Sequence, residues 1–370
     1  MFRLCRFPKA SRPKASCMFS VINLYPLPIA KPLRFFDVCA GIGGGRLGLM
    51  QAGLQCVGYS EIDPLPAKTY DVMHAQADAC VPTMSMHQNW GDLMTLNPHA
   101  LPDFEVLIGG FPCQTFSIAG KRAGFEDDRG LVIHGILNIL QAKQVPYFIL
   151  ENVKGLVSHD QGRTLKTVLA LLNQAGYWVQ YAVLDSADYG VPQMRERIYF
   201  VGMRHGYYQQ LFQWPAPVAS QPLQRYLHPT SHHRFTPEQP AFETFRRYLN
   251  NRYNQGRYTV ETLLAEEGVV LDTRQSDLRR YTQCCPTLRT GRHGILYVHE
   301  GAFYKLSPLE ALALQGFPLE HAQKAIQAGI SSTRLLSQAG NAMTVPVIHA
   351  LARELLKCGK SYALRTSTKS

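Results

Sequence analysis

The most constraining feature of the sequence is the regular alternation of short apolar runs with segments of helical spacing across residues 33–204. Such runs are typical of strands buried on both faces, and the intervening segments have the period of amphipathic helices. The pattern therefore predicts an α/β fold with a Rossmann-like, mostly parallel sheet covered by helices on both faces. We expect parallel strands at 33–39, 55–60, 104–109 and 145–150, helices at 46–52, 131–142 and 164–174, and an antiparallel edge from 177–184 and 197–203.

Composition narrows the class of protein. The chain has 370 residues, of which 46% are hydrophobic and 18% charged, as in ordinary globular proteins of one or two domains. No stretch approaches the ~20 unbroken apolar residues that a membrane-spanning helix needs. The nine cysteines include no C-x-x-C pair, which is typical of reduced thiols in a cytoplasmic protein and not of a zinc ribbon or redox motif. We therefore expect a cytoplasmic protein without a metal site.

The basic residues are unevenly distributed along the chain. Residues 1–34 contain seven basic residues and no acidic ones, whereas residues 35–204 contain 12 basic and 16 acidic residues. Basic flanks around an acidic central segment favour a polyanionic partner such as DNA or RNA. We expect a basic N-terminal extension without fixed structure at 1–32, for which either Met1 or Met18 could be the initiator. After it we expect a first domain at 33–204, a smaller irregular domain at 205–305, C-terminal helices at 306–358 and a basic tail at 359–370. The C-terminal helices would begin with a Ser307–Glu310 capping box and end with a helical region at 337–356.

Glycines between the first predicted strand and helix indicate a nucleotide site. Gly41, Gly43 and Gly44 permit a tight turn and a close approach of the backbone to a ligand. Glu61 follows Gly41 by 20 residues, the spacing at which an acid accepts hydrogen bonds from ribose hydroxyls. Asp92 would add an adenine contact from a third loop. The spacing predicts an adenosine-type cofactor and fits NAD and S-adenosylmethionine equally.

A second group of residues points to covalent chemistry. Cys113 follows a buried strand that ends in Gly109-Gly110, so it would stand at the carboxyl end of the sheet, where ligands bind. A thiolate there is a competent nucleophile. Glu151 ends the next strand and would reach the same edge as a proton donor. Gln193, Arg195 and Arg197 alternate, and in a strand they would share one face.

Together these segments resemble the cytosine-C5 DNA methyltransferase family, most closely the bacterial restriction–modification type. The resemblance extends from about Leu33 to about Leu356, in the family's motif order. It rests on the segments Phe36-Asp37-Val38-Cys39-Ala40-Gly41-Ile42-Gly43-Gly44, Phe111-Pro112-Cys113-Gln114, Glu151-Asn152-Val153, Gln193-Met194-Arg195-Glu196-Arg197, Thr287-Leu288 and Gly340-Asn341-Ala342.

The resemblance implies a methyl transfer from S-adenosylmethionine to C5 of a cytosine that is flipped out of a short duplex DNA site. Cys113 would bond to C6, Glu151 would protonate N3, Arg195 would support the O2 edge, and Arg197 would hold Glu151. Residues 33–204 would form the catalytic domain, 205–305 the target-recognition domain, and 306–358 would return to the catalytic domain. A monomer associated with the nucleoid, acting beside a cognate restriction endonuclease, is the expected setting.

The resemblance also assigns binding residues. The cofactor site would comprise Asp37, Cys39, Ala40, Gly41, Ile42, Gly43, Gly44, Glu61, Ile62, Asp92, Pro112 and Asn341. Substrate contacts would come from Gln114, Ser117, Gln193, Arg274, Thr287, Arg289 and Arg292, with Gln275, Thr290 and His293 as further candidates for reading base edges or phosphates.

Three positions depart from the family pattern. Cys39 stands where the family usually has Phe, Ile62 where it often has Trp, and Ala342 where it usually has Ser. The two missing aromatic side chains normally contact adenine, so cofactor affinity is the property most affected. We expect activity to be retained, because the acids, the cysteine and the arginines are in place.

Other functions explain part of the pattern. An RNA cytosine-5 methyltransferase acting on tRNA would have the same catalytic residues, but the long basic target region favours duplex DNA. A catalytically silent DNA-binding regulator would not need the full catalytic set. An NAD dehydrogenase explains the glycines and Glu61 but gives no role to Cys113 beside Glu151.

Overall fold

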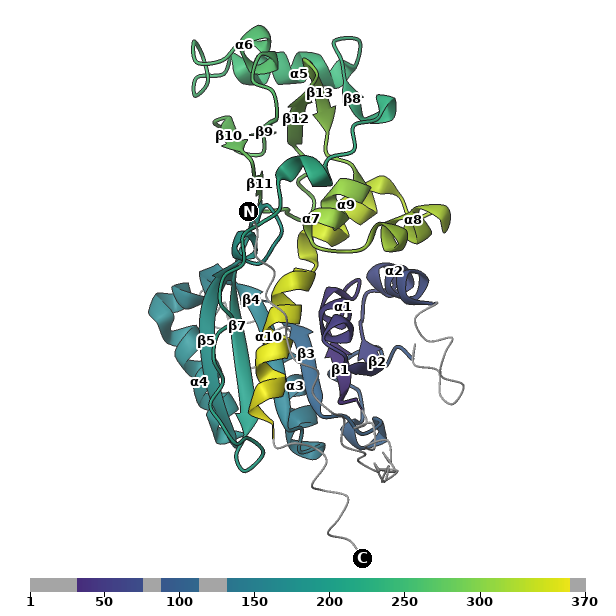
Figure 1. The fold of residues 1–370 in the computed structure, drawn as a ribbon, viewed down its shortest axis with the longest axis vertical. Helices are drawn as coiled ribbons and strands as arrows, with labels where there is room; N and C mark the ends of the chain where they lie inside the picture. The colour runs from purple at the N-terminus through teal and green to yellow at the C-terminus, as the bar shows by residue number, and fades with distance from the viewer. Residues whose placement is uncertain (1–31, 76–87, 113–131, 360–370) are drawn as a thin grey trace, which may run out of the picture. The chain divides into compact units, whose positions relative to one another are not determined.

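The computed structural model describes residues 32–75, 88–112 and 132–359 (Figure 1). Most of the expected N-terminal extension and of the C-terminal tail lies outside these residues, as do Cys113, Gln114 and Ser117. In the described part of the chain, no helix combines the length and apolarity needed to cross a bilayer.

The larger of two main sheets has six strands in the order β2-β1-β3-β4-β7-β5. Strands β2, β1, β3 and β4 are parallel, and β7 runs antiparallel to both β4 and β5. The expected mostly parallel sheet with an antiparallel edge is therefore confirmed. The strand bounds are β1 Arg34–Val38, β2 Gln55–Ser60, β3 Val106–Gly110, β4 Tyr147–Val153, β5 Tyr177–Asp185 and β7 Glu196–Arg204.

Alternating side chains of these strands enter two separate hydrophobic cores. Phe36, Leu107 and Phe148 pack with α3 and α4 on one face, whereas the adjacent residues Phe35 and Ile149 pack with α1 and α10 on the other. Burial on both faces explains why the strands are continuous apolar runs in the sequence. The helices that flank this sheet or its edge are α1 Gly44–Gln51, α2 Pro64–His74, α3 Val132–Ala142, α4 Arg163–Gln174 and α10 Val345–Cys358.

A second, five-stranded antiparallel sheet has the order β10-β9-β12-β13-β8. It has a core of its own, in which Phe235 of β8 and Phe303 of β13 pack against Phe242 and Phe245 of helix α5. The bounds are β8 Arg234–Phe235, α5 Pro240–Leu249, α6 Val260–Leu264, β9 Val269–Asp272, β10 Arg279–Thr282, β12 Ile295–His299 and β13 Ala302–Lys305.

Two short strands join the parts of the chain that carry the two sheets. Gln193–Met194 (β6) lies directly before β7 and pairs in parallel with Cys285–Pro286 (β11), which follows β10. The segment before β7 is thereby fixed to the chain that carries the second sheet. Short 3-10 helices occupy several connections, at Pro98–Ala100, Lys154–Val157, His159–Gly162, Ser186–Asp188, Leu223–Tyr226 and Ser231–His233.

The C-terminal helices begin at the expected capping box. The Ser307 hydroxyl accepts from the Glu310 backbone N–H at 3.2 Å, and the Ser307 N–H donates to Glu310 Oε2 at 2.7 Å. The prediction of one helical region at 337–356 is wrong in its continuity, because residues 342–344 separate α9 from α10, which has a proline in its first turn. The three helices before α10 are α7 Pro308–Leu314, α8 Leu319–Gln327 and α9 Ser332–Asn341.

Candidate active site

The loop after β1 is shaped by its glycines. Gly43 has a φ of 82°, which favours glycine, and a Cβ on it would lie 2.2 Å from His74 Nε2. A Cβ on Gly44 would lie 2.3 Å from the Met343 carbonyl oxygen. The glycines therefore let α1 start tightly packed against α2 and the chain before α10.

Glu61 connects the tip of β2 to this loop. Its Oε2 accepts from the Gly41 N–H at 2.8 Å and its Oε1 from the Asp63 N–H at 2.9 Å. Burial raises the pKa of Glu61, and these backbone hydrogen bonds oppose the rise. The Asn89 side chain bonds to the backbone of both Glu61 and Gly91, so it brings the third loop next to the second.

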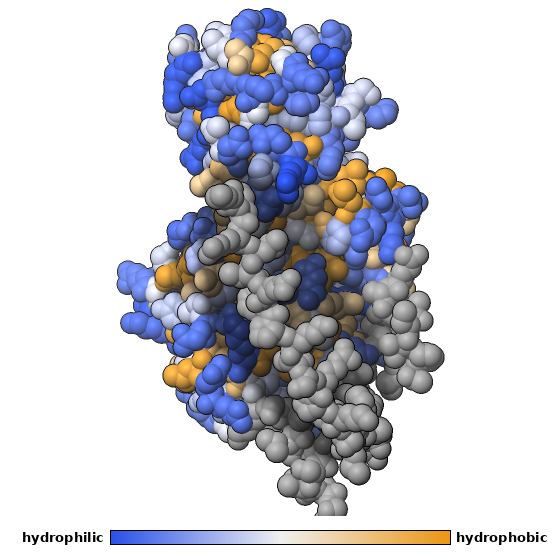
Figure 2. Space-filling model, in the orientation of Figure 1, coloured by the Kyte–Doolittle hydropathy of each residue, from blue (hydrophilic) through white to orange (hydrophobic). Residues whose placement is uncertain are grey.

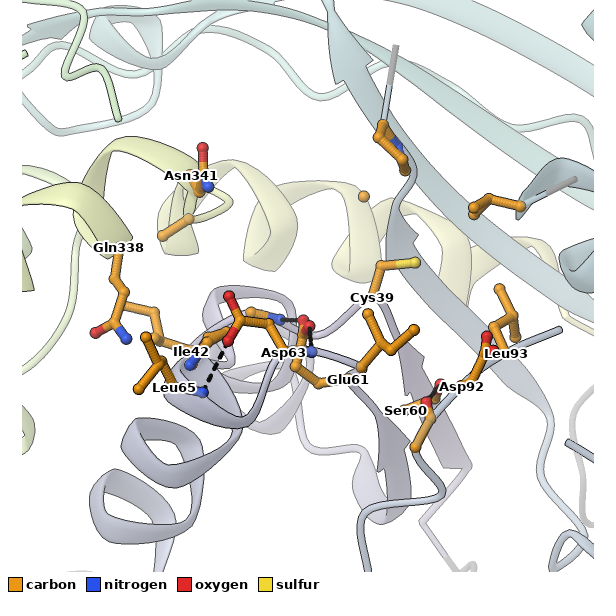
Figure 3. A pocket seen from close by; sticks show the side chains of 18 of the residues that line it. Cys39, Ile42, Ser60, Glu61, Asp63, Leu65, Asp92, Leu93, Gln338 and Asn341 are labelled. Carbon is orange, nitrogen blue, oxygen red and sulfur yellow. Dashed lines mark hydrogen bonds between the residues drawn. The ribbon is translucent and has the colours of Figure 1, made fainter. Parts of the chain in front are cut away.

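A cavity of about 1040 Å³ lies at the carboxyl ends of β1, β2 and β3. In Figure 3, Asp92 and Leu93 lie on one side, Gln338 and Asn341 of α9 lie on the other, and Glu61 is between them. Eight of the predicted cofactor residues line it: Cys39, Gly41, Ile42, Glu61, Ile62, Asp92, Pro112 and Asn341. Asp37, Ala40, Gly43 and Gly44 are buried and do not line it, so their contact with a cofactor stays a prediction.

Two lining residues occupy positions that are usually aromatic in the family that the sequence resembles. Cys39 has a φ of 50°, and burial together with the carboxylates of Glu61, Asp37 and Asp92 raises the pKa of its thiol to about 12. The thiol is therefore neutral at neutral pH and acts as a small apolar group. Ile62 is 70% exposed at the rim.

Sequence reasoning missed most of the α9 wall and several neighbouring positions. The lining residues that the sequence did not assign to the cofactor are Ser60, Asp63, Leu65, Pro66, Leu93, Met94, Thr95, Gly110, Val132, Thr290, Arg334, Ser337, Gln338 and Ala342. Those near residues 60–66 and 91–95 are close to Glu61 and Asp92, which the sequence had already assigned to the cofactor site. Those on α9 are distant in the sequence, and only the Gly340-Asn341-Ala342 segment gave a signal for them.

Glu151 forms a second group with Arg197 at the same edge of the sheet. Glu151 lies in β4 between Gly110 of β3 and Tyr199 of β7, and it is 9% exposed. Its Oε1 lies 3.1 Å from Arg197 Nε. Burial raises the pKa of Glu151, and the charges of Arg197 and then Arg195 oppose the rise. A buried carboxyl with a raised pKa is suited to proton donation.

The chain leading to Cys113 is fixed next to this carboxyl. The Asn152 side chain donates to the Phe111 carbonyl at 2.8 Å, and Pro112 lines the cavity. A Cβ on Gly110 would lie 3.4 Å from Glu151 Oε2. Pro112, the residue before Cys113, and Gly110 thus both line the cavity, and Gly110 lies next to Glu151.

The structure gives the terminal nitrogens of Arg195 partners within the protein. Its side chain is buried, and its terminal nitrogens donate to the carbonyls of Leu288 and Gly340, each at 3.1 Å, and of Ala342 at 2.9 Å. Burial, followed by the charge of Arg197, lowers the pKa of Arg195 to about 9, so the side chain remains a cation at neutral pH. These terminal N–H groups hold backbone together, and Arg197 is the arginine that contacts Glu151.

Two side chains that were predicted to contact the substrate are bonded to other parts of the protein. Gln193 is fully buried, donates to the Leu314 carbonyl at 2.9 Å and accepts from the Leu288 N–H at 3.2 Å. Arg274 forms a buried ion pair with Asp272 at 2.7 Å and donates to the Thr287 carbonyl. Burial raises the pKa of Asp272, but the hydrogen bonds and charge of Arg274 outweigh it and hold the pKa below its usual value.

Other predicted substrate contacts lie at or near the surface. The Thr287 hydroxyl donates to the Met194 carbonyl at 2.6 Å. Arg289 and Arg292 are exposed, as are Thr290 and His293, whereas Gln275 is partly buried. The exposed arginines remain candidates for contacts with a polyanion. Among the described residues, no cluster of histidine, cysteine and acidic side chains could hold a metal ion.

Comparison with known proteins supports the resemblance to cytosine-C5 DNA methyltransferases. A family model described as C-5 cytosine-specific DNA methylase matches residues 33–357. The Type II methyltransferase M.NlaX of Neisseria lactamica is 34% identical, with 87% of this chain and 96% of that protein covered. M.HpaII of Haemophilus parainfluenzae is 32% identical, with 89% and 90% covered.

Solved structures share the fold. The S. pombe Dnmt2 methyltransferase superposes with a TM-score of 0.64 at 18% identity, covering 88% of this chain and 98% of that one. A putative DNA modification methyltransferase encoded within an E. coli prophage gives a TM-score of 0.62 at 19% identity, covering 88% and 99%.

Proposed function

The chain belongs to the C-5 cytosine-specific DNA methylase family, and from that premise we propose that it acts through a covalent bond between Cys113 and C6 of a flipped-out cytosine. It is a DNA (cytosine-5-)-methyltransferase of the Type II restriction–modification kind, and S-adenosylmethionine is its methyl donor. The observation that carries the proposal is the Glu151–Arg197 pair next to Gly110, three residues before Cys113.

The cysteine solves a chemical problem of the substrate. C5 of cytosine is a poor nucleophile, and addition of the Cys113 thiolate to C6 turns the ring into an enamine that is nucleophilic at C5. When bound, S-adenosylmethionine supplies an electrophilic methyl group. Once C5 is methylated, water removes the C5 proton, the C5=C6 double bond re-forms as the thiolate leaves by β-elimination, and N3 returns its proton to Glu151.

Glu151 neutralises the negative charge that this addition places on the ring. As C6 is attacked, N3 becomes more basic, and the protonated Glu151 carboxyl donates its proton there. Arg197 fixes the carboxyl through its Nε, and a guanidinium at this point also favours negative charge on the O2 edge of the base. Arg195 takes no part in this step and acts as a positioning residue through its backbone contacts.

The cavity residues fit the adenosine and methionine parts of the methyl donor. The Glu61 carboxylate accepts from two backbone N–H groups and has further lone pairs for ribose hydroxyls. Cys39, Ile62 and Leu93 give an apolar surface for adenine, with Asp92 beside it. Asn341 lines the opposite wall (Figure 3).

We assign DNA recognition to residues 205–305, with catalysis in 33–204 and with 306–358 completing the cofactor cavity. Hydrophilic residues cover most of the visible surface over β8–β13 in Figure 2. Several arginines of residues 205–305 are exposed, and among them those at 279, 280, 289 and 292 suit phosphates and guanine edges. Contacts of this kind offset the few kcal/mol that flipping a base costs.

The biological setting follows from the reaction. Methylation of one cytosine in a short site protects that site from a restriction endonuclease with the same specificity. We propose that the protein acts in the cytoplasm, on nucleoid DNA, as a monomer, because one subunit contains all the proposed catalytic groups.

Bisulfite sequencing tests this proposal and reveals the target site. Plasmid DNA from a bacterial host without cytosine methylation of its own should carry 5-methylcytosine at one position of every copy of a short sequence when the host expresses the protein. Cys113→Ser should abolish the modification, whereas the control Cys284→Ser, in a half-buried thiol next to Met194, should retain it. Methylation of tRNA but not of DNA would overturn the choice of substrate.

A further inference from the structure

The turn at residues 289–292 belongs to two sites at once. It directly follows Thr287-Leu288, and the Arg292 N–H donates to the Arg289 carbonyl to close it. Its two arginines are exposed. Its second residue, Thr290, lines the cofactor cavity. One short turn therefore carries two exposed cations and also supplies part of the cavity wall.

Solvent-exposed hydrogen bonds hold the turn against the last part of α9. The Thr290 hydroxyl lies within hydrogen-bonding distance of Asn341 Oδ1 and, at 3.2 Å, of the Ser337 carbonyl oxygen. The Gly291 N–H donates to the Ser337 hydroxyl at 3.0 Å. Both α9 residues, like Thr290, line the cavity. The chain around Thr290 is exposed, so these bonds compete with water.

The base of the turn is held more firmly than its tip. Leu288 is fixed from both its N–H and its carbonyl, by Gln193 and Arg195. A Cβ on Gly340 would lie 2.5 Å from the backbone of both Arg289 and Thr290, so α9 and the turn are in backbone contact there. The turn therefore touches α9 in two ways, through this backbone contact and through the hydrogen bonds to Ser337 and Asn341.

We infer that the turn 289–292 couples DNA binding to cofactor binding, with the Thr290 hydroxyl as the positioning group. This inference rests on the proposed function. Phosphates held by Arg289 and Arg292 favour the docked turn, and a cofactor in the cavity favours the same turn, because its wall is then complete. Each ligand raises the affinity for the other by the same factor, as thermodynamic linkage requires.

Equilibrium binding tests the coupling without turnover. The dissociation constant of S-adenosylhomocysteine is measured by calorimetry, alone and with a saturating duplex that contains the site found by bisulfite sequencing. The wild-type ratio of the two constants should fall in the range of about 5- to 150-fold. Thr290→Val removes the hydroxyl at nearly constant shape and should reduce this ratio by roughly three- to tenfold.

Two further variants separate coupling from other effects. Thr290→Ser keeps the hydroxyl and should keep the wild-type ratio. Thr282→Val, at an exposed position of β10, should also leave the ratio unchanged. A change in S-adenosylhomocysteine affinity that is equal with and without DNA would make Thr290 a plain cofactor contact and overturn the inference. A wild-type ratio near one would also overturn it.

The coupling and the proposed chemistry can fail independently. A protein that methylates DNA through Cys113 but has a ratio near one retains its proposed function and loses only the coupling. A protein that couples the two ligands but forms no bond through Cys113 loses only the proposed catalytic mechanism.

Discussion

At the scale of single residues, Arg195 and Arg197 show how two similar side chains acquire different tasks. Arg195 lies between β6 and β7, where the strand is interrupted, and its guanidinium binds three backbone carbonyls of distant segments. Arg197 lies in β7 opposite β4 and reaches Glu151. The Gln193-Met194-Arg195-Glu196-Arg197 pattern predicted a common face, and burial does alternate along it, but the sequence gives no sign of the interruption between β6 and β7.

The pH dependence of the reaction should report on the Glu151–Arg197 pair. Because the protonated carboxyl is the active form and its pKa is raised, the methylation rate should fall on the alkaline side as pH rises through that pKa, whereas protonation of the Cys113 thiolate lowers the rate on the acid side. Arg197→Met removes a charge that lowers this pKa, so the alkaline limb should move to higher pH. The rate itself should fall about tenfold or more, since a hydrogen bond to a charged group contributes about 1.5–3 kcal/mol.

Single-turnover rates over a pH series measure both effects. Lys166→Met, which removes an exposed cation from α4, is the matched control and should leave the limb unchanged. A limb that moves to lower pH in Arg197→Met would contradict the assignment of Glu151 as the proton donor.

Arg274 should be a stability residue and not a base reader. Arg274→Met leaves the buried Asp272 carboxylate without its partner, and this should destabilise the protein by about 3–5 kcal/mol near neutral pH. In the wild type the depressed pKa of Asp272 contributes stability that is lost as pH falls through it. In the variant the unpaired carboxylate is penalised instead, and acid that protonates it should reduce the difference from wild type.

Urea denaturation at several pH values measures this prediction. Arg292→Met changes an exposed arginine of the same region and should weaken DNA binding with little effect on stability. Equal stability of Arg274→Met and wild type would show that the ion pair is dispensable.

At the scale of elements, close backbone contacts between helices and loops shape the site. α1 approaches the chain before α10 through Gly44, and α9 approaches the turn 289–292 through Gly340. Each contact joins segments that are far apart in the sequence. The cofactor cavity therefore has walls from β1, β2, β3 and α9.

Gly340→Ala tests the second of these contacts. The added methyl would lie 2.5 Å from two backbone atoms of the turn, and the shift this forces should cost about 1–3 kcal/mol of stability. It should also weaken S-adenosylhomocysteine binding, because α9 carries Asn341. Thermal unfolding and calorimetry measure the two effects. Gly155→Ala, where a Cβ meets its nearest atom at 4.0 Å, is the control, and an equally small effect of both variants would contradict the close packing.

Sequence reasoning succeeded for elements whose local pattern determines their environment. The prediction of a strand at 55–60 coincides with β2, and the other buried strands agree to within a few residues, because burial on both faces leaves an unbroken apolar run. For the second sheet the sequence predicted only an irregular domain, because β8 and β10 are short and most of β10 is exposed. The α9 wall was mostly missed, because tertiary packing places it at the cavity.

At the scale of the whole chain, one junction connects the proposed DNA-recognition domain, the cavity and the strand that carries Arg197. The pairing of β6 with β11, together with Gln193 and Arg195, ties the base of the turn 289–292 to the strand that carries Arg197. α9 completes the cofactor cavity and contacts the same turn. If the second sheet holds DNA as we propose, this junction links the DNA to the Glu151 edge of the first sheet.

The most direct test of the account is covalent trapping. A duplex with 5-fluorocytosine at the mapped position cannot lose fluorine as it would lose a proton, so β-elimination is blocked and the enzyme should remain attached to the DNA when S-adenosylmethionine is present. We predict a complex that survives denaturant, with the adduct on the peptide that contains Cys113, and no complex for Cys113→Ser. Methylation of ordinary DNA without such a complex, or an adduct on a different cysteine, would contradict the proposed mechanism.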